Sequence, residues 1–274
     1  MCRVFRVSTS GYYAWRRRPR SSKEDDALLI EIKTIYAESK GRYGSPRIHR
    51  MLCQRGIRCG QKRVARLMRE HGICARRVRR FKATTDAKHT LPVAENVLDR
   101  QFEVAVPHAR WAADITYIWT RHGWLYLAVV MDLFSRRIIG WSMQQTLERS
   151  LVVDALEMAL RARHPPSGLL HHSDRGSQYA SGTYQDLLRR AGCRCSMSRR
   201  GNCWDNAPVE SFFSTLKMEL VHERRYETRQ QARAEIFEFI EVWYNRQRLH
   251  SSLGYMSPAD YESKMIAENL ALAA

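Results

Sequence analysis

Apolar residues recur at helical spacing in the first third of the chain and at strand spacing further on. The helical spacing predicts three helices that are each packed on one side, over residues 25–39, 46–54 and 61–70. Ser45 and Pro46 are expected to open the second helix as N-cap and first helical residue, and Gly72 to end the third in a left-handed cap. Two short helices around a tight turn predict a helix-turn-helix.

Strand-like runs dominate the middle of the chain. Three of them follow one another with only short turns between, and strand-like and helical runs then alternate. The strands are predicted over residues 110–120, 125–133, 137–143, 168–172 and 193–197. The helices are predicted over residues 148–163, 179–191 and 205–220. A three-stranded meander followed by such alternation predicts an α/β fold with a mixed sheet.

These patterns and the changes in composition divide the chain into five parts. Residues 1–22 form a basic segment, a short helix followed by a linker, and 23–75 form the helix-turn-helix-like DNA-binding domain. Residues 76–108 are a basic linker with two prolines, expected to be extended and to touch DNA. The core covers 109–265 and includes C-terminal helices, and 266–274 is a tail.

The chain is strongly basic along its whole length. Its 274 residues include 46 Lys and Arg against 28 Asp and Glu, a net charge of +18. Such an excess favours nucleic acid as a partner over a membrane, because no apolar run is long enough to span a bilayer. Seven cysteines without a disulfide-like or zinc-like spacing predict reduced thiols, and the N-terminus lacks a signal core. We therefore expect a cytoplasmic, nucleoid-associated protein.

The predicted helix over 61–70 carries apolar residues on one side and basic residues over much of the rest. The basic residues are Lys62, Arg63, Arg66 and Arg69. They either contact DNA or form the solvated face of an ordinary amphipathic helix. The positive charge of the whole chain favours DNA contact.

Three acidic residues stand where a carboxylate needs a partner or marks a site. Asp114 interrupts an apolar strand, where a charge is costly unless it is paired. Asp174 follows a buried strand, at the carboxyl end where α/β sheets build their sites. Glu210 lies on a helix that Phe212 and Leu216 anchor to the core. Because carboxylates on two strands and a helix can hold two divalent metal ions for phosphoryl transfer, the chain is a candidate for an enzyme that cuts and joins DNA.

Other polar residues nearby have structural explanations. Asp132 lies at a strand end and is expected to cap a turn, and Asp205 and Asn206 are expected to cap the helix that follows them. His171 and His172 lie on both faces of one short strand, which is more typical of a structural role, and magnesium prefers oxygen ligands. A serine nucleophile is not expected, because the chain has no Gly-x-Ser-x-Gly sequence.

Lys217 follows Glu210 by seven residues, or two helical turns, so both lie on one face of the predicted helix, with Ser214 between them. A cation there can hold a phosphate beside the carboxylates. A surface lysine in an ordinary helix pair explains the spacing equally well, so both interpretations stay open.

Recognisable motifs occur in order in six segments that span nearly the whole chain, over residues 42–48, 111–117, 130–136, 172–179, 202–213 and 244–251. In sequence letters they read RYGSPRI, WAADITY, VMDLFSR, HSDRGSQY, NCWDNAPVESFF and YNRQRLHS. Together they resemble the second-frame (OrfB) DDE transposases of the insertion-sequence-three family, within the retroviral-integrase catalytic core superfamily.

The resemblance implies a ribonuclease-H-like mixed-sheet catalytic core preceded by a small all-α helix-turn-helix domain. It also implies strand cleavage and strand transfer at insertion-sequence ends, with two Mg²⁺ ions for which Mn²⁺ can substitute. Asp114, Asp174 and Glu210 match the family's catalytic and metal-binding triad, and Lys217 matches its basic residue after the glutamate.

The resemblance implies partners as well. They are double-stranded DNA, as terminal repeats and as target, further copies of the chain on that DNA, and the upstream-frame (OrfA) protein or its fusion. In the family that first-frame segment carries its own helix-turn-helix and leucine zipper and is joined by ribosomal frameshifting. Without it, this chain is expected to recognise element ends poorly.

Two other functions compete with strand transfer. A non-enzymatic DNA-binding regulator would use the basic helices, but it leaves the charge of Asp114 within an apolar strand unexplained. A ribonuclease-H-type nuclease would use the same acids on RNA–DNA hybrids, and a hybrid-cleavage assay separates it from a strand-transfer enzyme.

Overall fold

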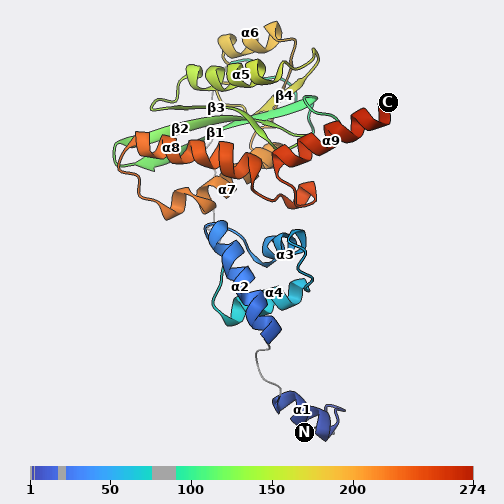
Figure 1. Cartoon of the computed structure of the whole chain (residues 1–274). Helices are drawn as coiled ribbons and strands as arrows, with labels where there is room; N and C mark the ends of the chain where they lie inside the picture. Colours follow the sequence, from blue (N-terminus) through green and yellow to red (C-terminus); the bar gives the residue numbers. More distant parts are fainter. Residues whose placement is uncertain (1, 3, 18–22, 76–90, 274) are drawn as a thin grey trace. The chain divides into compact units, whose positions relative to one another are not determined.

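A helical unit and a sheet-containing unit make up the structure, over residues Met1–Arg76 and Arg77–Ala274 (Figure 1). This computed structural model describes residues 2, 4–17, 23–75 and 91–273. Much of both predicted linkers, at 18–22 and 76–90, therefore lies outside the described residues.

The helical unit contains four helices, α1 (Thr9–Arg17), α2 (Lys23–Glu38), α3 (Ser45–Gln54) and α4 (Gln61–Glu70). The apolar stripes of α2, α3 and α4 meet in a small core that includes Leu28, Ile32, Ile48, Leu52 and Val64. All four helices were expected from the sequence, and the predicted bounds of α4 are those observed.

Two helix ends test the predicted caps. Gly72 has a φ of +65°, in the left-handed region, as predicted for the residue that ends α4. The N-cap predicted at Ser45 is wrong by one residue, because the extended residue before α3 is Gly44. Glycine has no side chain to accept from the first-turn N–H groups, and no side-chain cap forms there.

Five strands form one mixed sheet in the order β3-β2-β1-β4-β5. They are β1 (Arg110–Thr120), β2 (Gly123–Asp132), β3 (Ile138–Gln144), β4 (Leu170–Ser173) and β5 (Arg194–Met197). The meander β1–β2–β3 is antiparallel, whereas β4 lies parallel to β1 and β5 parallel to β4. Every strand lies close to its predicted position, and the predicted mixed sheet is confirmed.

Helices cover both faces of this sheet (Figure 1). One face carries α5 (Arg149–Arg163) and α6 (Gly182–Arg190), and the other carries α7 (Ala207–Glu219), α8 (Arg229–Glu238) and α9 (Pro258–Ala273). The shorter helical elements are the 3-10 helices η1 (Cys203–Asn206), η2 (Val221–Glu223) and η4 (Ser251–Leu253) and the π-helix η3 (Phe239–Tyr244).

The core under α5 requires a glycine in β3. A Cβ atom at Gly140 would lie 2.2 Å from the carbonyl oxygen of Ala155, so only glycine lets α5 approach the sheet this closely. Leu151 and Leu156 of α5 thereby pack on Ala113 and Val130.

The structure differs from the predicted boundaries in three places. The helix predicted over 205–220 is divided into η1 and α7, and α9 runs through the predicted tail. Residues 95–102, predicted as linker, contact the core: the N–H groups of Val97 and Leu98 donate to Ser196 Oγ at 3.0 and 3.1 Å. The polar composition of this segment is typical of a linker. The sequence did not indicate these contacts, because Ser196 lies 99 positions after Val97.

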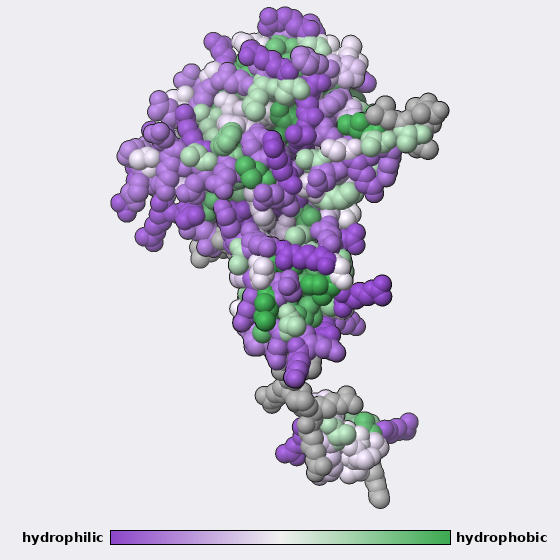
Figure 2. Space-filling view, viewed as in Figure 1, coloured by the Kyte–Doolittle hydropathy of each residue, from purple (hydrophilic) through white to green (hydrophobic). Residues whose placement is uncertain are grey.

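Hydrophilic residues cover most of the face shown in Figure 2, with small hydrophobic areas between them. In the described parts of the chain, no helix combines the length and the apolar character needed to cross a membrane. The six cysteines whose side chains are described are all free thiols.

Candidate active site and nucleic-acid contacts

The sheet register places Asp114 and Asp174 side by side. The parallel ladder of β1 and β4 ends with Ala113 opposite Ser173, so the next residue of each chain segment is an acid at the same edge. Asp114 therefore lies within β1 beyond the end of β4, and Asp174 lies directly after β4, as predicted from the sequence.

Backbone N–H groups orient both aspartates. Asp114 Oδ1 accepts from the Ile115 N–H at 2.8 Å, and Asp174 Oδ1 accepts from the Gly176 N–H at 2.9 Å. Each carboxylate thus has one oxygen held by its own loop or strand.

Glu210 lies in the first turn of α7, which is anchored beside the aspartates. The side chain of Asn206, the residue before α7, donates from Nδ2 to the carbonyl oxygen of Ala113 at 3.0 Å. Val209 and Phe212 are buried on either side of Glu210, whereas Glu210 itself is exposed. The helix that carries Glu210 is therefore tied to the residue that precedes Asp114.

The charges of the neighbouring groups act on Asp114. Burial raises the pKa of Asp114 well above its usual range, and the negative charges of Asp174 and Glu210 raise it further. The ammonium of Lys217 acts in the opposite direction. Negative charge accumulated in this way is stabilised by a bound cation.

The donor set fits a hard divalent cation, because all three acids offer carboxylate oxygens. In the described residues, no three Asp, Glu, His or Cys side chains already converge as a metal site. Glu210 is exposed at the start of its helix, and its charge acts on Asp114.

Lys217 lies in the last turn of α7, and its charge acts on Asp114. Its residue is only 7% exposed, and its Nζ lies 5.1 Å from the centre of the Tyr117 ring. Burial lowers the pKa of Lys217 to about 8, and the charge of Asp114 opposes this shift. A lysine buried in this way is not the plain surface residue that spacing alone allowed.

Asp132 has the structural role predicted for it. It is 0% exposed, and its carboxylate accepts from the N–H groups of His108 and Phe134, both at 3.0 Å. The bond from Phe134, two residues later, is the turn cap expected from the sequence.

The adjacent histidines are structural as well. His172 is bonded to Ser196 Oγ at 2.9 Å and Ser198 Oγ at 3.1 Å, and His171 Nε2 lies 3.1 Å from the hydroxyl of Tyr184. Burial lowers the pKa of His171 to about 3 and that of His172 to about 4, so both rings are neutral.

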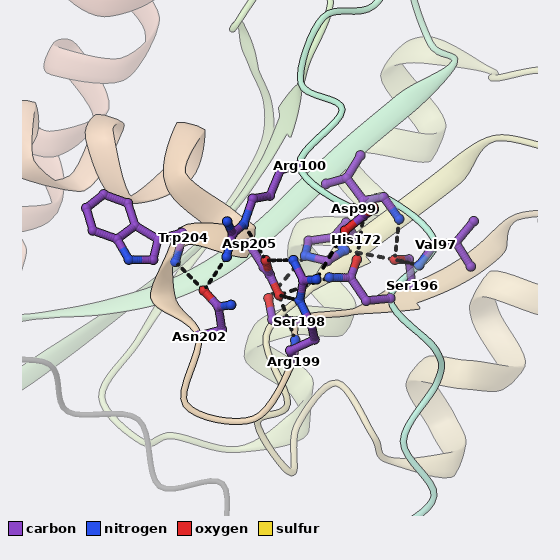
Figure 3. A network of polar contacts seen from close by, with 12 residues as sticks. Val97, Asp99, Arg100, His172, Ser196, Ser198, Arg199, Asn202, Trp204 and Asp205 are labelled. Carbon is purple, nitrogen blue, oxygen red and sulfur yellow. Dashed lines mark hydrogen bonds and ion pairs between the residues drawn. The ribbon is translucent and has the colours of Figure 1, made fainter.

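Asp205 is the centre of a polar network that the sequence did not reveal (Figure 3). Its buried carboxylate accepts from Arg199, from Arg100 Nε at 3.0 Å and from Asn96 Nδ2 at 2.9 Å. These bonds hold the pKa of Asp205 well below its usual range. The predicted N-cap role of Asp205 is therefore wrong: it joins the end of β5, residues 95–102 and η1, directly before α7.

Two of the four basic residues of α4 that were predicted to contact DNA form ion pairs inside the protein instead. Asp25 of α2 accepts from Arg63 Nε at 2.6 Å and from Arg66 Nη2 at 2.9 Å, and these bonds lower the pKa of Asp25. Lys62 and Arg69 are exposed and lie on one face of α4.

Known proteins match both units. Residues 23–81 match the HTH-like domain family, and residues 105–203 and 191–258 match two Integrase core domain families. The protein is 44% identical to the transposase InsF for insertion sequence IS3A of Escherichia coli (strain K12), over 97% of this chain and 94% of that protein. The chain belongs to the family of insertion-sequence transposases with an integrase core.

Other relatives agree with this membership. An uncharacterized 31 kDa protein of insertion element IS600 from Shigella sonnei is 45% identical over 96% of this chain and 98% of that protein. In fold, the structure resembles a chain of the simian T-cell lymphotropic virus intasome, with a TM-score of 0.50 and 14% identity over 84% of this chain and 74% of that chain.

Membership of this family assigns an activity to the chain. It is a DNA phosphoryl-transfer enzyme that cleaves and transfers strands in transposition, and it depends on divalent metal ions. The predicted helix-turn-helix and ribonuclease-H-like core are the two domains of that enzyme. The competing interpretation as a non-enzymatic regulator is thereby set aside.

Proposed function

We propose that Asp114, Asp174 and Glu210 are the catalytic residues and that together they bind two Mg²⁺ ions, with Mn²⁺ as a substitute. The observation that carries this proposal is that Asp114 and Asp174 lie side by side where β1 leaves β4, and that the charges of both Asp174 and Glu210 raise the pKa of Asp114. When bound, two such ions would supply Lewis acidity to the scissile phosphate and would lower the pKa of an attacking water or 3′-hydroxyl.

The protein groups orient the reaction. Asp114 and Asp174 are each oriented by a backbone N–H that donates to Oδ1. Glu210 completes the set from the exposed first turn of α7, and Asn206 fixes the distance of that turn from β1. Lys217 places a positive charge on the same face of α7, where it holds a phosphate oxygen near the reacting 3′ end.

Strand transfer on the ends of the flanking element tests this function. Labelled, pre-cleaved ends are incubated with the protein and Mg²⁺, with and without the upstream-frame (OrfA) protein. We expect joined product, and more of it when OrfA is supplied. An RNA–DNA hybrid of the same length serves as control, and cleavage of the hybrid without any joining would favour a ribonuclease-H-type nuclease instead.

Joining two ends requires both to be held together, so we propose that several copies of the chain act on one DNA. Size determination of the complex with terminal-repeat DNA checks this. A single copy on two bridged ends would contradict it.

Lys217→Ala is expected to reduce strand transfer by about a hundredfold, because one fixed charge beside the reacting phosphate is lost. Lys217→Arg should recover part of the activity, since the charge survives while the shape changes. Joined product from pre-cleaved ends measures both variants. Lys264→Ala, a change to an exposed lysine on α9, is the matched control and should behave as the wild type.

We propose that Lys62 and Arg69 contact DNA phosphates from the exposed face of α4. Replacing both by Ala should weaken DNA binding. It should also reduce the magnitude of the slope of log affinity against log salt concentration by about 2. Affinity for terminal-repeat DNA, measured over a series of salt concentrations, gives the slope.

Arg63→Ala is the contrasting variant, because Arg63 is bonded to Asp25. It should leave the salt slope nearly unchanged and lower the free energy of unfolding by about 1–2 kcal/mol. Equal flattening by Arg63→Ala and by the Lys62 and Arg69 pair would contradict this assignment.

A further inference from the structure

Three aromatic rings and one lysine form a continuous series beside the catalytic acids. Lys217 Nζ lies 5.1 Å from the ring centre of Tyr117, the ring of Tyr117 lies 5.0 Å from that of Trp124, and Trp124 lies 4.8 Å from Trp119. We call the surface of Tyr117, Trp119 and Trp124 the aromatic strip.

The strip occupies the end of the β1–β2 hairpin. Tyr117 and Trp119 project to the same face of β1 as Ala113, opposite to the face of Asp114, because side chains alternate along a strand. The strip is connected to the acids through Lys217, whose Nζ lies near the Tyr117 ring and whose charge acts on Asp114. Nearer the middle of the sheet the face of Ala113 packs against α5, but at the hairpin end Trp119 and Trp124 are 58% and 41% exposed. Two adjacent indoles are therefore open to solvent.

Hairpin stability explains only part of this arrangement. Trp119 lies directly opposite Trp124 in the antiparallel ladder, and such cross-strand aromatic pairs stabilise hairpins. That role is fulfilled by the contact between the rings and does not require exposed indole surface. Neighbouring exposed aromatic residues of this size mark an interaction site.

Positive charge lies at both ends of the strip. Lys217 stands at the end nearest the acids, where its charge acts on Asp114. At the other end Arg229 donates from Nε to the carbonyl oxygen of Trp124 at 2.9 Å, and it lines a polar cavity of about 810 Å³ together with His122 and Arg233. Aromatic rings between cations are the arrangement with which proteins bind unpaired nucleotides, rings for bases and cations for phosphates.

We propose that the aromatic strip stacks an unpaired base of the bound DNA while Lys217 and the Arg229 cavity hold the flanking phosphates. This inference rests on the proposed function and adds a substrate feature to it, namely DNA that is locally unpaired next to the scissile phosphate. Three steps of about 5 Å correspond to no more than about four nucleotides of stacked strand. A stretch of about four unpaired nucleotides is therefore long enough to extend from Lys217 along the whole strip.

The test compares two element ends, one fully paired and one with four unpaired nucleotides next to the scissile phosphate, with 2-aminopurine as the outermost unpaired base. Binding is measured in Ca²⁺, so that the readout does not depend on catalysis. We expect the wild type to bind the unpaired end roughly five- to a hundredfold more tightly and to quench 2-aminopurine fluorescence.

Three variants assign the effect. Trp119→Ala should lose both the preference and the quenching, and Trp119→Tyr should retain them because a ring remains. Phe237→Ala is the matched control, since Phe237 is an exposed aromatic residue on α8 outside the strip, and it should behave as the wild type. Circular dichroism verifies that each variant is folded.

Two results would overturn the proposal: equal affinity of the wild type for both ends, or full preference in Trp119→Ala. An abasic site in place of 2-aminopurine provides a readout without any mutation, and it should weaken wild-type binding to the unpaired end. If the wild type joins strands in Mg²⁺ but shows no preference for the unpaired end, the proposed role of the aromatic strip is wrong and the catalytic assignment stands. If the wild type neither binds nor joins, both fail.

Discussion

Asp114→Asn, Asp174→Asn and Glu210→Gln are each expected to lower cleavage and joining by at least about a thousandfold, because groups that share metal ions act as a unit. Binding to terminal-repeat DNA should persist, since the helical unit and the basic surface are unchanged. Yield of cleaved and joined product from labelled element ends measures the loss. Glu268→Gln, on the exposed surface of α9, is the control for a glutamate changed elsewhere.

The thermal stability of Asp114→Asn distinguishes loss of a catalytic group from loss of structure. Asp114 is buried beside two further negative charges, so Asp114→Asn removes repulsion and desolvation from the metal-free protein. Its thermal midpoint in chelator should equal or exceed that of the wild type, although its activity is lost. A strongly lowered midpoint, or an active Glu210→Gln enzyme, would contradict the assignment of these residues.

Asp132→Asn tests whether Asp132 belongs with the three proposed metal-binding acids. Asp132 accepts two backbone N–H bonds, and an asparagine oxygen can keep one of them. Partial activity with reduced stability is expected. Complete loss of activity with an unchanged midpoint would place Asp132 among the metal-binding residues instead.

Local patterns explain why the strands and the acids could be located from the sequence. Alternation and apolar runs depend on neighbouring residues, so β1 was predicted to the residue and Asp114 and Asp174 were expected at strand positions that the sheet brings together. That Lys217 shares the face of Glu210 also follows from helical spacing alone. Its burial does not, since that depends on Tyr117 of another element.

Long-range pairing explains what the sequence did not show. Arg63 is bonded to an aspartate 38 positions earlier, and Arg100 to one 105 positions later. Nothing in the local pattern distinguishes an arginine that pairs inside the protein from one that contacts DNA. Asp205 was interpreted as a cap for the same reason, because its position before a helix is typical of capping residues.

Removal of divalent metal is expected to abolish chemistry while leaving DNA binding intact. The three candidate ligands offer only oxygen, which suits Mg²⁺ and Mn²⁺ in octahedral coordination. Ca²⁺ has the same ligand preference but a larger and more flexible coordination sphere, so it should support binding to element ends without cleavage. Gel shift and cleavage assays on one set of labelled ends compare the four conditions, namely Mg²⁺, Mn²⁺, Ca²⁺ and chelator.

Joining of pre-cleaved, labelled element ends to target DNA tests the central claim most directly, because it requires the metal ions, the three acids and DNA in one step. The wild type is assayed in Mg²⁺, then in chelator, and again after Mg²⁺ is restored, with Glu210→Gln in parallel. We expect joined product from the wild type only while Mg²⁺ is present, and none from Glu210→Gln. Undiminished joining in chelator, or wild-type joining by Glu210→Gln, would contradict metal-dependent strand transfer at Asp114, Asp174 and Glu210.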